Sequence, residues 1–227
     1  MKKFVIIVAG GSGSRMGTEI PKQFLELCGK PILMHSIQRF IDFDPECEII
    51  LVLPDIQKKI WDDLIQKHSF LLPHIIASGG ETRFNSVLNG LNMIQGEGIV
   101  FIHDGVRPLV NRSTLLRCYE TAVKYGNAIP VLPVNESLRM VDGTQNKSVD
   151  RSLYFSVQTP QTFRSKLILK SFRQPYETVF TDDASVVEKA GFVINMVEGN
   201  HENIKITTPT DLIVAEAFLR KFQQKTL

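Results

Sequence analysis

Along most of the chain, short segments made almost entirely of apolar residues alternate with longer segments in which apolar residues recur every three or four positions. The first kind of segment predicts a strand buried on both faces, and the second predicts an amphipathic helix. In 82–93, for example, Phe84, Val87 and Leu91 fall on one helical face. This alternation indicates a Rossmann-like α/β fold, with a mostly parallel sheet and helices on both faces.

The pattern gives bounds for each element. The expected strands are Phe4–Gly10, Glu48–Leu53, His74–Ala77, Gly98–His103, Ala128–Val134, Phe192–Val197 and Ile204–Ile206. The expected helices are Pro31–Asp42, Ile56–Lys67, Thr82–Met93, Ser113–Tyr125, Ser165–Phe172, Asp182–Ala190 and a last helix from Pro209. Pro31 suits the first turn of its helix, and the hydroxyl of Ser113 is expected to cap the helix that it begins. No linker or repeat interrupts the chain, so we expect residues 1–227 to form one domain.

The alternation breaks between Asn135 and Ser156, where the chain becomes polar. The sequence MVDGTQN places an Asp-Gly pair between two short β-capable stretches, which is typical of a tight β-hairpin. A two-stranded hairpin with few apolar residues is marginally stable in water by itself. We therefore expect a hairpin arm at about residues 135–156 that protrudes from the domain.

Composition excludes several classes of protein. The chain has 43% hydrophobic and 22% charged residues and a net charge of +2, so no basic excess points to nucleic acid. Its apolar runs are shorter than the roughly 20 residues that span a bilayer. The three cysteines, Cys28, Cys47 and Cys118, are scattered and odd in number, which is typical of free thiols in a reducing compartment. We expect a cytoplasmic protein that binds neither nucleic acid nor membrane.

The first predicted strand ends in the glycine-rich sequence AGGSGSRMG, which begins at Ala9. Glycines let backbone N–H groups approach an anion closely, and the carboxyl end of a parallel strand is where such folds bind ligands. Arg15 and Lys22 add positive charge where a polyphosphate would lie. The stretch is not a P-loop, because no Gly-Lys follows, and Met16 departs from the dinucleotide fingerprint. Taken alone, it also fits a flexible turn with two solvated cations.

This stretch and the PKQF that follows it resemble the start of the nucleotidylyltransferases that act on sugar and polyol phosphates. The resemblance continues through GGETRFNSV, HDGVRP, VDR, TPQTF, TDDAS and NIKIT, which together are similar to motifs of the 2-C-methyl-D-erythritol 4-phosphate cytidylyltransferases. That family transfers CMP from CTP to 2-C-methyl-D-erythritol 4-phosphate and releases pyrophosphate, in the non-mevalonate pathway of isoprenoid synthesis. The resemblance also implies Mg²⁺ or another divalent cation as cofactor.

Other functions remain as alternatives. A ribitol-5-phosphate (polyol-phosphate) cytidylyltransferase fits AGGSGSRM almost as well, but VDR with Arg151 favours the methylerythritol substrate. A Rossmann oxidoreductase is disfavoured by Met16. A nucleotide-binding module without activity is disfavoured because cations stand at each motif position that the reaction needs.

The resemblance assigns roles residue by residue. Catalytic roles fall on Arg15, Lys22, Arg151 and Lys205. Nucleotide-binding roles fall on Ala9, Gly10, Gly11, Gly13, Gly80, Glu81 and Ser86. Substrate-binding roles fall on Asp104, Arg107, Ser137 and Thr159, and Asp104 is also the candidate metal ligand. The chain departs from the family where Glu81 replaces an Asp, Ser137 replaces a Thr, and Gly105 and Val106 replace two alanines.

The chemistry implied by the resemblance needs no general base. A phosphate monoester has a second pKa of about 6, so the attacking phosphate is already mostly a dianion at neutral pH. The remaining difficulty is to bring two anions together, which calls for fixed positive charge. None of the five histidines is therefore expected to be catalytic. The resemblance further implies a homodimer whose arms interlock, so that Ser137 and Arg151 act in the partner's site.

Overall fold

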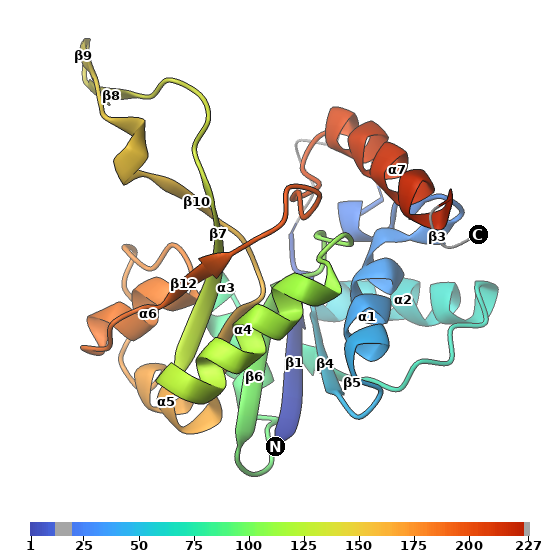
Figure 1. Ribbon diagram of the computed structural model, residues 1–227. Coiled ribbons are helices and arrows are strands. Elements are labelled where there is room, and N and C mark those ends of the chain that lie inside the picture. The colour runs from blue at the N-terminus through green and yellow to red at the C-terminus, as the bar shows by residue number, and fades with distance from the viewer. Residues whose placement is uncertain (12–19, 225–227) are drawn as a thin grey trace.

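An eight-stranded sheet runs through the centre of the computed structural model, which describes residues 1–11 and 20–224 (Figure 1). The strands follow the order β10-β7-β11-β6-β1-β4-β5, and β12 pairs with β7. Their bounds are β1 Lys2–Val8, β4 Glu48–Leu53, β5 Ile75–Ser78, β6 Gly98–Asp104, β7 Asn127–Pro133, β10 Phe155–Val157, β11 Gln161–Arg164 and β12 Met196–Glu198.

The main parallel part of the sheet consists of β5, β4, β1 and β6, and β12 is also parallel to β7. β11 is antiparallel to both β6 and β7, so it joins this parallel part to the rest of the sheet. The β1–β6 register places Val8 opposite Asp104, and the β1–β4 register places Val8 opposite Val52. The carboxyl ends of these strands therefore meet at one edge, where α/β folds bind ligands.

Helices cover both faces of the sheet (Figure 1). Their bounds are α1 Ile32–Phe43, α2 Asp55–Lys67, α3 Arg83–Leu91, α4 Arg112–Tyr125, α5 Ser165–Ser171, α6 Asp183–Lys189 and α7 Pro209–Gln224. Alternate residues of β1 face the two sides. Val5 and Ile7 pack with α1, α2 and α4, whereas Phe4 and Ile6 pack with α3, α5 and α6. Strands buried on both faces explain the uniformly apolar segments, and the predicted fold class is confirmed.

Two predictions about local structure were wrong. Residues 204–206 form no strand, because Ile206 is buried beside α7 and its backbone N–H donates to the carbonyl of Val106, which lies in a loop. Asn111 rather than Ser113 caps α4, and its side chain accepts a hydrogen bond from the N–H of Thr114 at 2.8 Å. Asn and Ser are comparable caps, and here the helix begins after the earlier of the two.

Several short elements lie outside the predicted pattern. β10 and β11 have three and four residues, too few for a recognisable period of two. A small hairpin of β2 (Glu26–Leu27) and β3 (Lys30–Pro31) follows the 3₁₀ turn η2 (Lys22–Phe24). The strand expected at 192–197 is shorter and later, as β12.

The predicted hairpin arm is present. β8 (Arg139–Asp142) and β9 (Gln145–Ser148) form a two-stranded sheet of their own, turned at Gly143 with a φ of 56°. The arm projects well beyond the central sheet (Figure 1). It leaves apolar side chains in solvent, among them Val141 at 69% and Leu153 at 76% exposure. This surface is unusual for a segment without a partner.

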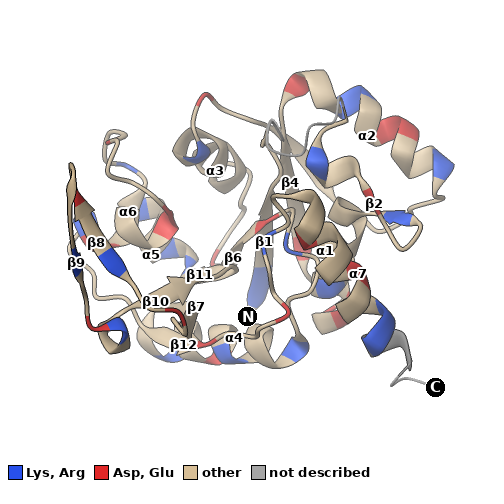
Figure 2. Ribbon diagram, turned by 90° about the horizontal axis from the view of Figure 1, so that it is seen from above, with Lys and Arg blue, Asp and Glu red and all other residues tan. Residues whose placement is uncertain are grey.

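The surface charges agree with the nearly neutral composition. Lysines and arginines are interspersed with aspartates and glutamates over the helices and the arm (Figure 2). Cys47 and Cys118 are buried free thiols, and Cys28 is exposed and free. Within the described residues, no helix has both the length and the apolar character that crossing a membrane requires.

Candidate active site

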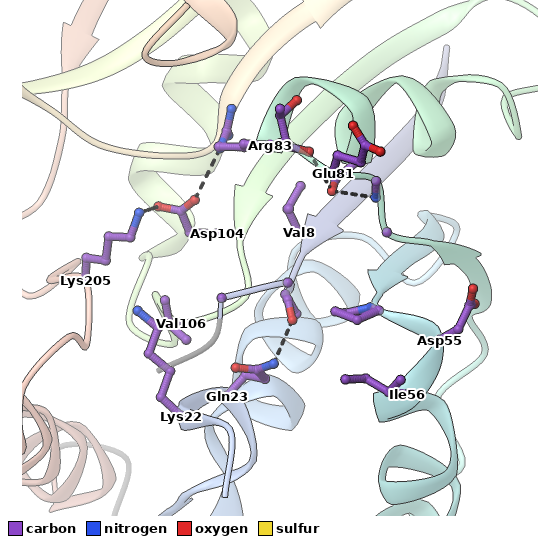
Figure 3. Close-up of a pocket in the computed structure, with 18 residues that line it drawn as sticks. Val8, Lys22, Gln23, Asp55, Ile56, Glu81, Arg83, Asp104, Val106 and Lys205 are labelled. Carbon is purple, nitrogen blue, oxygen red and sulfur yellow. Dashed lines mark hydrogen bonds and ion pairs between the residues drawn. The ribbon is translucent and has the colours of Figure 1, made fainter. Parts of the chain in front are cut away.

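A cavity of about 590 Å³ opens at the edge of the sheet where β1, β4 and β6 end (Figure 3). It is walled by these strand ends, by the turn before α3 and by the first residues of α2. Nine of the residues to which the sequence assigned roles line it: Ala9, Gly10, Gly11, Lys22, Gly80, Glu81, Ser86, Asp104 and Lys205.

Other predicted site residues lie elsewhere. Arg107 and Thr159 contact Asp104 without lining the cavity. Ser137 and Arg151 are exposed at the arm, where Arg151 donates a hydrogen bond to the carbonyl of Asn135. Gly13 and Arg15 lie outside the described residues.

One wall of the cavity joins the glycine-rich loop to the turn that carries Lys22. The buried side chain of Gln23 donates to the carbonyl of Ala9 at 2.7 Å and to the side-chain oxygen of Gln57 at 2.6 Å. A Cβ on Gly11 would stand 3.4 Å from Cε of Lys22, so the lysine side chain lies against the loop. Gln23 thus fixes Lys22 beside the strand end. Sequence reasoning gave Gln23 no role, although it is part of the quoted motif PKQF.

Asp104 forms the opposite wall, amid three positive charges. Lys205 Nζ and Arg107 Nε lie 3.1 and 3.2 Å from its Oδ2, and Arg83 Nε lies 4.0 Å from Oδ1. The backbone N–H of Asp104 donates to the hydroxyl of Thr159 at 3.0 Å. Burial alone would raise the pKa of Asp104, but these cations outweigh burial and hold it well below its ordinary range. The carboxylate therefore stays ionised at physiological pH.

The turn before α3 is closely packed. A Cβ on Gly80 would stand 2.4 Å from Cβ of Asn85, so this position has no room for a side chain. The hydroxyl of Ser86 accepts from the N–H of Gly80 and donates to the carbonyl of Thr82, both at 3.0 Å. Thr82 caps α3 by accepting from the N–H of Asn85 at 3.1 Å. The turn thus holds its backbone rigid, while Glu81 is exposed at the cavity rim.

Arg83 has a role that sequence reasoning missed. Its two terminal nitrogens donate to the two carboxylate oxygens of Asp183, each at 2.7 Å. Burial would lower the pKa of Arg83, but the charge of Asp183 raises it above its ordinary value, so the guanidinium stays protonated. Both residues lie in quoted motifs, GGETRFNSV and TDDAS, and that was the available signal.

His103 lies directly behind Asp104 and is fully buried. Its Nδ1 lies 3.0 Å from the hydroxyl of Thr159, its Nε2 lies 3.0 Å from the carbonyl of Arg107, and its ring meets Phe40 edge-on. Burial lowers the pKa of His103 to about 4, so the ring is neutral at physiological pH. Its contacts are those of a residue that supports the end of β6.

The cavity residues can hold a divalent cation only when phosphate oxygens of a bound nucleotide supply further ligands to it. No cluster of three His, Cys, Asp or Glu side chains suited to a metal is found among residues 1–11 and 20–224. Mg²⁺ in nucleotide sites is commonly held by one or two carboxylates together with substrate phosphates and water. Asp104 can supply one such carboxylate, and Oδ1 is the oxygen farther from the surrounding cations.

This arrangement is suited to binding phosphates. Lys22 and Lys205 bring positive charge into the cavity from two sides, and the glycine-rich strand end brings backbone N–H groups. The rigid turn at Gly80 offers backbone donors and acceptors for a planar base. The geometry therefore favours a nucleotide whose phosphates point toward the two lysines.

Comparisons with known proteins point to one family. A family model described as 2-C-methyl-D-erythritol 4-phosphate cytidylyltransferase matches residues 3–221. Proteins of that name from Bacteroides thetaiotaomicron and Phocaeicola vulgatus are 49% and 51% identical over 219 residues, which is 96% of this chain and 100% of theirs. The solved structure of the enzyme from Thermus thermophilus aligns with a TM-score of 0.77 at 31% identity, covering 97% of this chain and 100% of that one. The Francisella tularensis structure gives 0.79 at 32%, covering 96% and 99%.

The buried neutral His103 should make stability depend on pH. Unfolded histidine binds a proton near its ordinary pKa of about 6.5, whereas His103 in the folded protein does so only near 4. Between these two pKa values the unfolded state binds more protons than the folded state does. The stability that the neutral His103 contributes is therefore complete above about pH 6.5 and is lost as the pH falls. We expect a loss of about 3 kcal/mol as pH falls to 4. Denaturant unfolding at several pH values measures it.

The control for this prediction is His103→Gln, which keeps a polar side chain but does not titrate. The variant should be less stable than wild type at pH 7, and its stability should fall less steeply between pH 6.5 and 4. Equal slopes for the two proteins would show that other groups cause the loss.

Proposed function

Because the chain belongs to the 2-C-methyl-D-erythritol 4-phosphate cytidylyltransferase family, we propose that the cavity at the sheet edge is the active site for that reaction. The enzyme transfers CMP from CTP to 2-C-methyl-D-erythritol 4-phosphate, releases pyrophosphate and forms 4-(cytidine 5'-diphospho)-2-C-methyl-D-erythritol. The family match over residues 3–221 is the observation that carries this function. The ribitol-5-phosphate alternative is not favoured, since the named relatives are methylerythritol enzymes.

CTP lies across the cavity in this proposal. Its base rests at the turn of Gly80, Glu81 and Ser86, and its triphosphate follows the strand end from Ala9 to Gly11. The carbonyl of Gly80 and the backbone of Glu81 read the cytosine edge, since the N–H of Gly80 and the hydroxyl of Ser86 are already engaged with each other in holding the turn. A contact made by the backbone explains why Glu replaces the family's Asp without loss of the site.

The substrate phosphate enters beside Lys205, whose side chain is 43% exposed at the cavity. One of its oxygens attacks the α-phosphorus of CTP and forms a new P–O bond. The bond from the α-phosphorus to the oxygen that bridges to the β-phosphorus breaks, and pyrophosphate leaves with that electron pair. Lys22 and Lys205 stabilise the negative charge that gathers in the transition state. Arg15 has the same role in the sequence prediction.

Asp104 serves the reaction by holding Lys205 in place and by offering one carboxylate oxygen to a nucleotide-bound cation. Mg²⁺, when bound there, neutralises charge on the phosphate oxygens. Because Asp104 already has three cationic neighbours, an ion without phosphates would be repelled. Asp104 would therefore hold a divalent cation only together with phosphate oxygens of CTP.

The arm supports a homodimer. Ser137 and Arg151 do not line the cavity of their own subunit, and the arm that carries them projects away from the sheet (Figure 1). The arm also exposes Val141, Leu153 and Tyr154, which a second copy would bury. A two-fold dimer would bring each arm, with Arg151, to the partner's cavity. The single domain of residues 1–227 would thus use residues 135–156 for dimerisation.

The proposed function predicts the substrate. Purified protein with CTP, Mg²⁺ and 2-C-methyl-D-erythritol 4-phosphate should release pyrophosphate, measured by a coupled phosphate assay. With ribitol 5-phosphate, kcat/KM should fall by roughly 100-fold or more, because groups placed for one polyol are left unpaired by another. Comparable turnover with the two substrates would contradict the assigned specificity.

The two lysines should matter for turnover more than for folding. Lys22→Ala and Lys205→Ala should each lower kcat by roughly 100- to 1,000-fold, the usual effect of removing one preorganised charge from such a site. Lys166→Ala, an exposed lysine paired with Glu97, is the control and should keep wild-type kcat. Circular dichroism checks the fold. Near-normal kcat in both cavity variants would refute the mechanism.

The dimer predicts complementation between two inactive variants. Arg151→Ala protein mixed with Lys22→Ala protein should regain activity once subunits exchange. If Arg151 acts in the partner's cavity, a mixed dimer has one site with both lesions and one site with neither. Mass-labelled subunits verify the exchange. Exchange without recovered activity would mean that Arg151 serves its own subunit.

A further inference from the structure

The side chain of Arg83, which lines the cavity, is fixed by a bidentate ion pair with Asp183. Arg83 begins α3, and its two terminal nitrogens bind the two oxygens of Asp183 at 2.7 Å each. The side chain of Asp183, which begins α6, is 1% exposed. Bidentate pairing fixes the plane of a guanidinium as well as its position. The direction of the third nitrogen, Nε, is therefore fixed as well.

That third nitrogen faces Asp104. Nε of Arg83 lies 4.0 Å from Oδ1, whereas Lys205 and Arg107 approach Oδ2 at 3.1 and 3.2 Å. Arg83 is thus the cation nearest Oδ1, whereas Lys205 and Arg107 both approach Oδ2. Arg83 and Lys205 reach the carboxylate from opposite sides (Figure 3).

The partner of Arg83 is itself anchored to the strand that carries Asp104. Asp182 caps α6, and it accepts a hydrogen bond from Gln161 of β11 at 2.6 Å. The side-chain oxygen of Gln161 accepts from the N–H of Ala184 at 2.8 Å. Gln161 pairs with Ile102 of β6, which ends at Asp104. The contacts therefore form a closed ring from β6 through Arg83 and α6 back to β6.

We propose that Arg83 is a positioning residue of the active site. It orients the carboxylate of Asp104 through Oδ1, and it holds the turn before α3 at a fixed place relative to α6. Arg83 acts through Asp104 and does not need to touch the reacting atoms. This inference rests on the proposed function, because it assigns Arg83 to a reaction in which Asp104 takes part.

A double-mutant cycle separates this role from a purely structural one. Arg83→Met removes the charge and keeps much of the side-chain length, and Asp104→Asn removes the charge that it orients. Arg83→Met should lower kcat/KM by roughly 10- to 100-fold, the usual effect of misplacing a catalytic group. The change in kcat and the change in KM for CTP should also stand in the same proportion in Arg83→Met as in Asp104→Asn. The double variant should lie within about threefold of Asp104→Asn alone, since residues that act through one another are not additive.

Several outcomes would overturn the inference. If the two losses multiply in the double variant, Arg83 acts independently of Asp104. If Arg83→Met lowers the melting temperature but leaves kcat and KM unchanged, the ion pair is structural. Should Arg83→Met fail to fold, Arg83→Lys and Asp183→Asn replace it in the same cycle, and wild-type kinetics in both would refute the proposal.

Two controls complete the experiment. Arg112→Met removes an arginine that binds the carbonyls of Asp42 and Phe43 away from the cavity, and it should leave kcat and KM unchanged. The wild-type assay identifies which proposal fails. Absence of CTP turnover in the wild type would refute the proposed function, whereas an active wild type with multiplicative losses would refute the role of Arg83 only.

Discussion

The carboxylate of Asp104 holds together parts of the chain that are far apart in sequence. It stands at the end of β6, and its three cationic neighbours come from α3, from the loop after β6 and from the segment before α7. A buried carboxylate without such neighbours would be strongly unfavourable. Each cation is likewise kept close to the others by the charge of Asp104. The shape of the cavity therefore depends on this charge balance.

The site is built from permanent charges and rigid backbone, with little that titrates near neutrality. Asp104 and Arg83 keep their charges, and His103 keeps its neutral ring, because burial and neighbours move each pKa away from neutral pH. Such a site does not need to rearrange protons before it meets a polyphosphate. This suits a reaction whose nucleophile is already ionised.

The sequence predicted the parallel part of the sheet well because uniform apolar strands and helical periodicity are local signals. It placed Lys22, Asp104 and Lys205 in one site by family resemblance, since nothing local links them. The role of Arg83 was missed although Arg83 and Asp183 both lie in quoted motifs, because nothing in either motif indicates that tertiary packing pairs these two side chains. Residues 204–206 were predicted to form a strand because two isoleucines flank a lysine, but both isoleucines pack in the cluster beneath α7 and the N–H of Ile206 donates to the loop residue Val106.

The position of the antiparallel strand β11 in the sequence decides when one edge of the sheet becomes paired during synthesis. β7 reaches β6 only through β11, which comes after the arm. As the chain leaves the ribosome, β1, β4, β5 and β6 are complete early, and domains tend to fold as synthesis proceeds. The outer edge of β6 then stays unpaired until residue 164 has emerged, with unsatisfied backbone groups open to other chains. The short β11 thus sets how long the nascent protein presents a bare sheet edge.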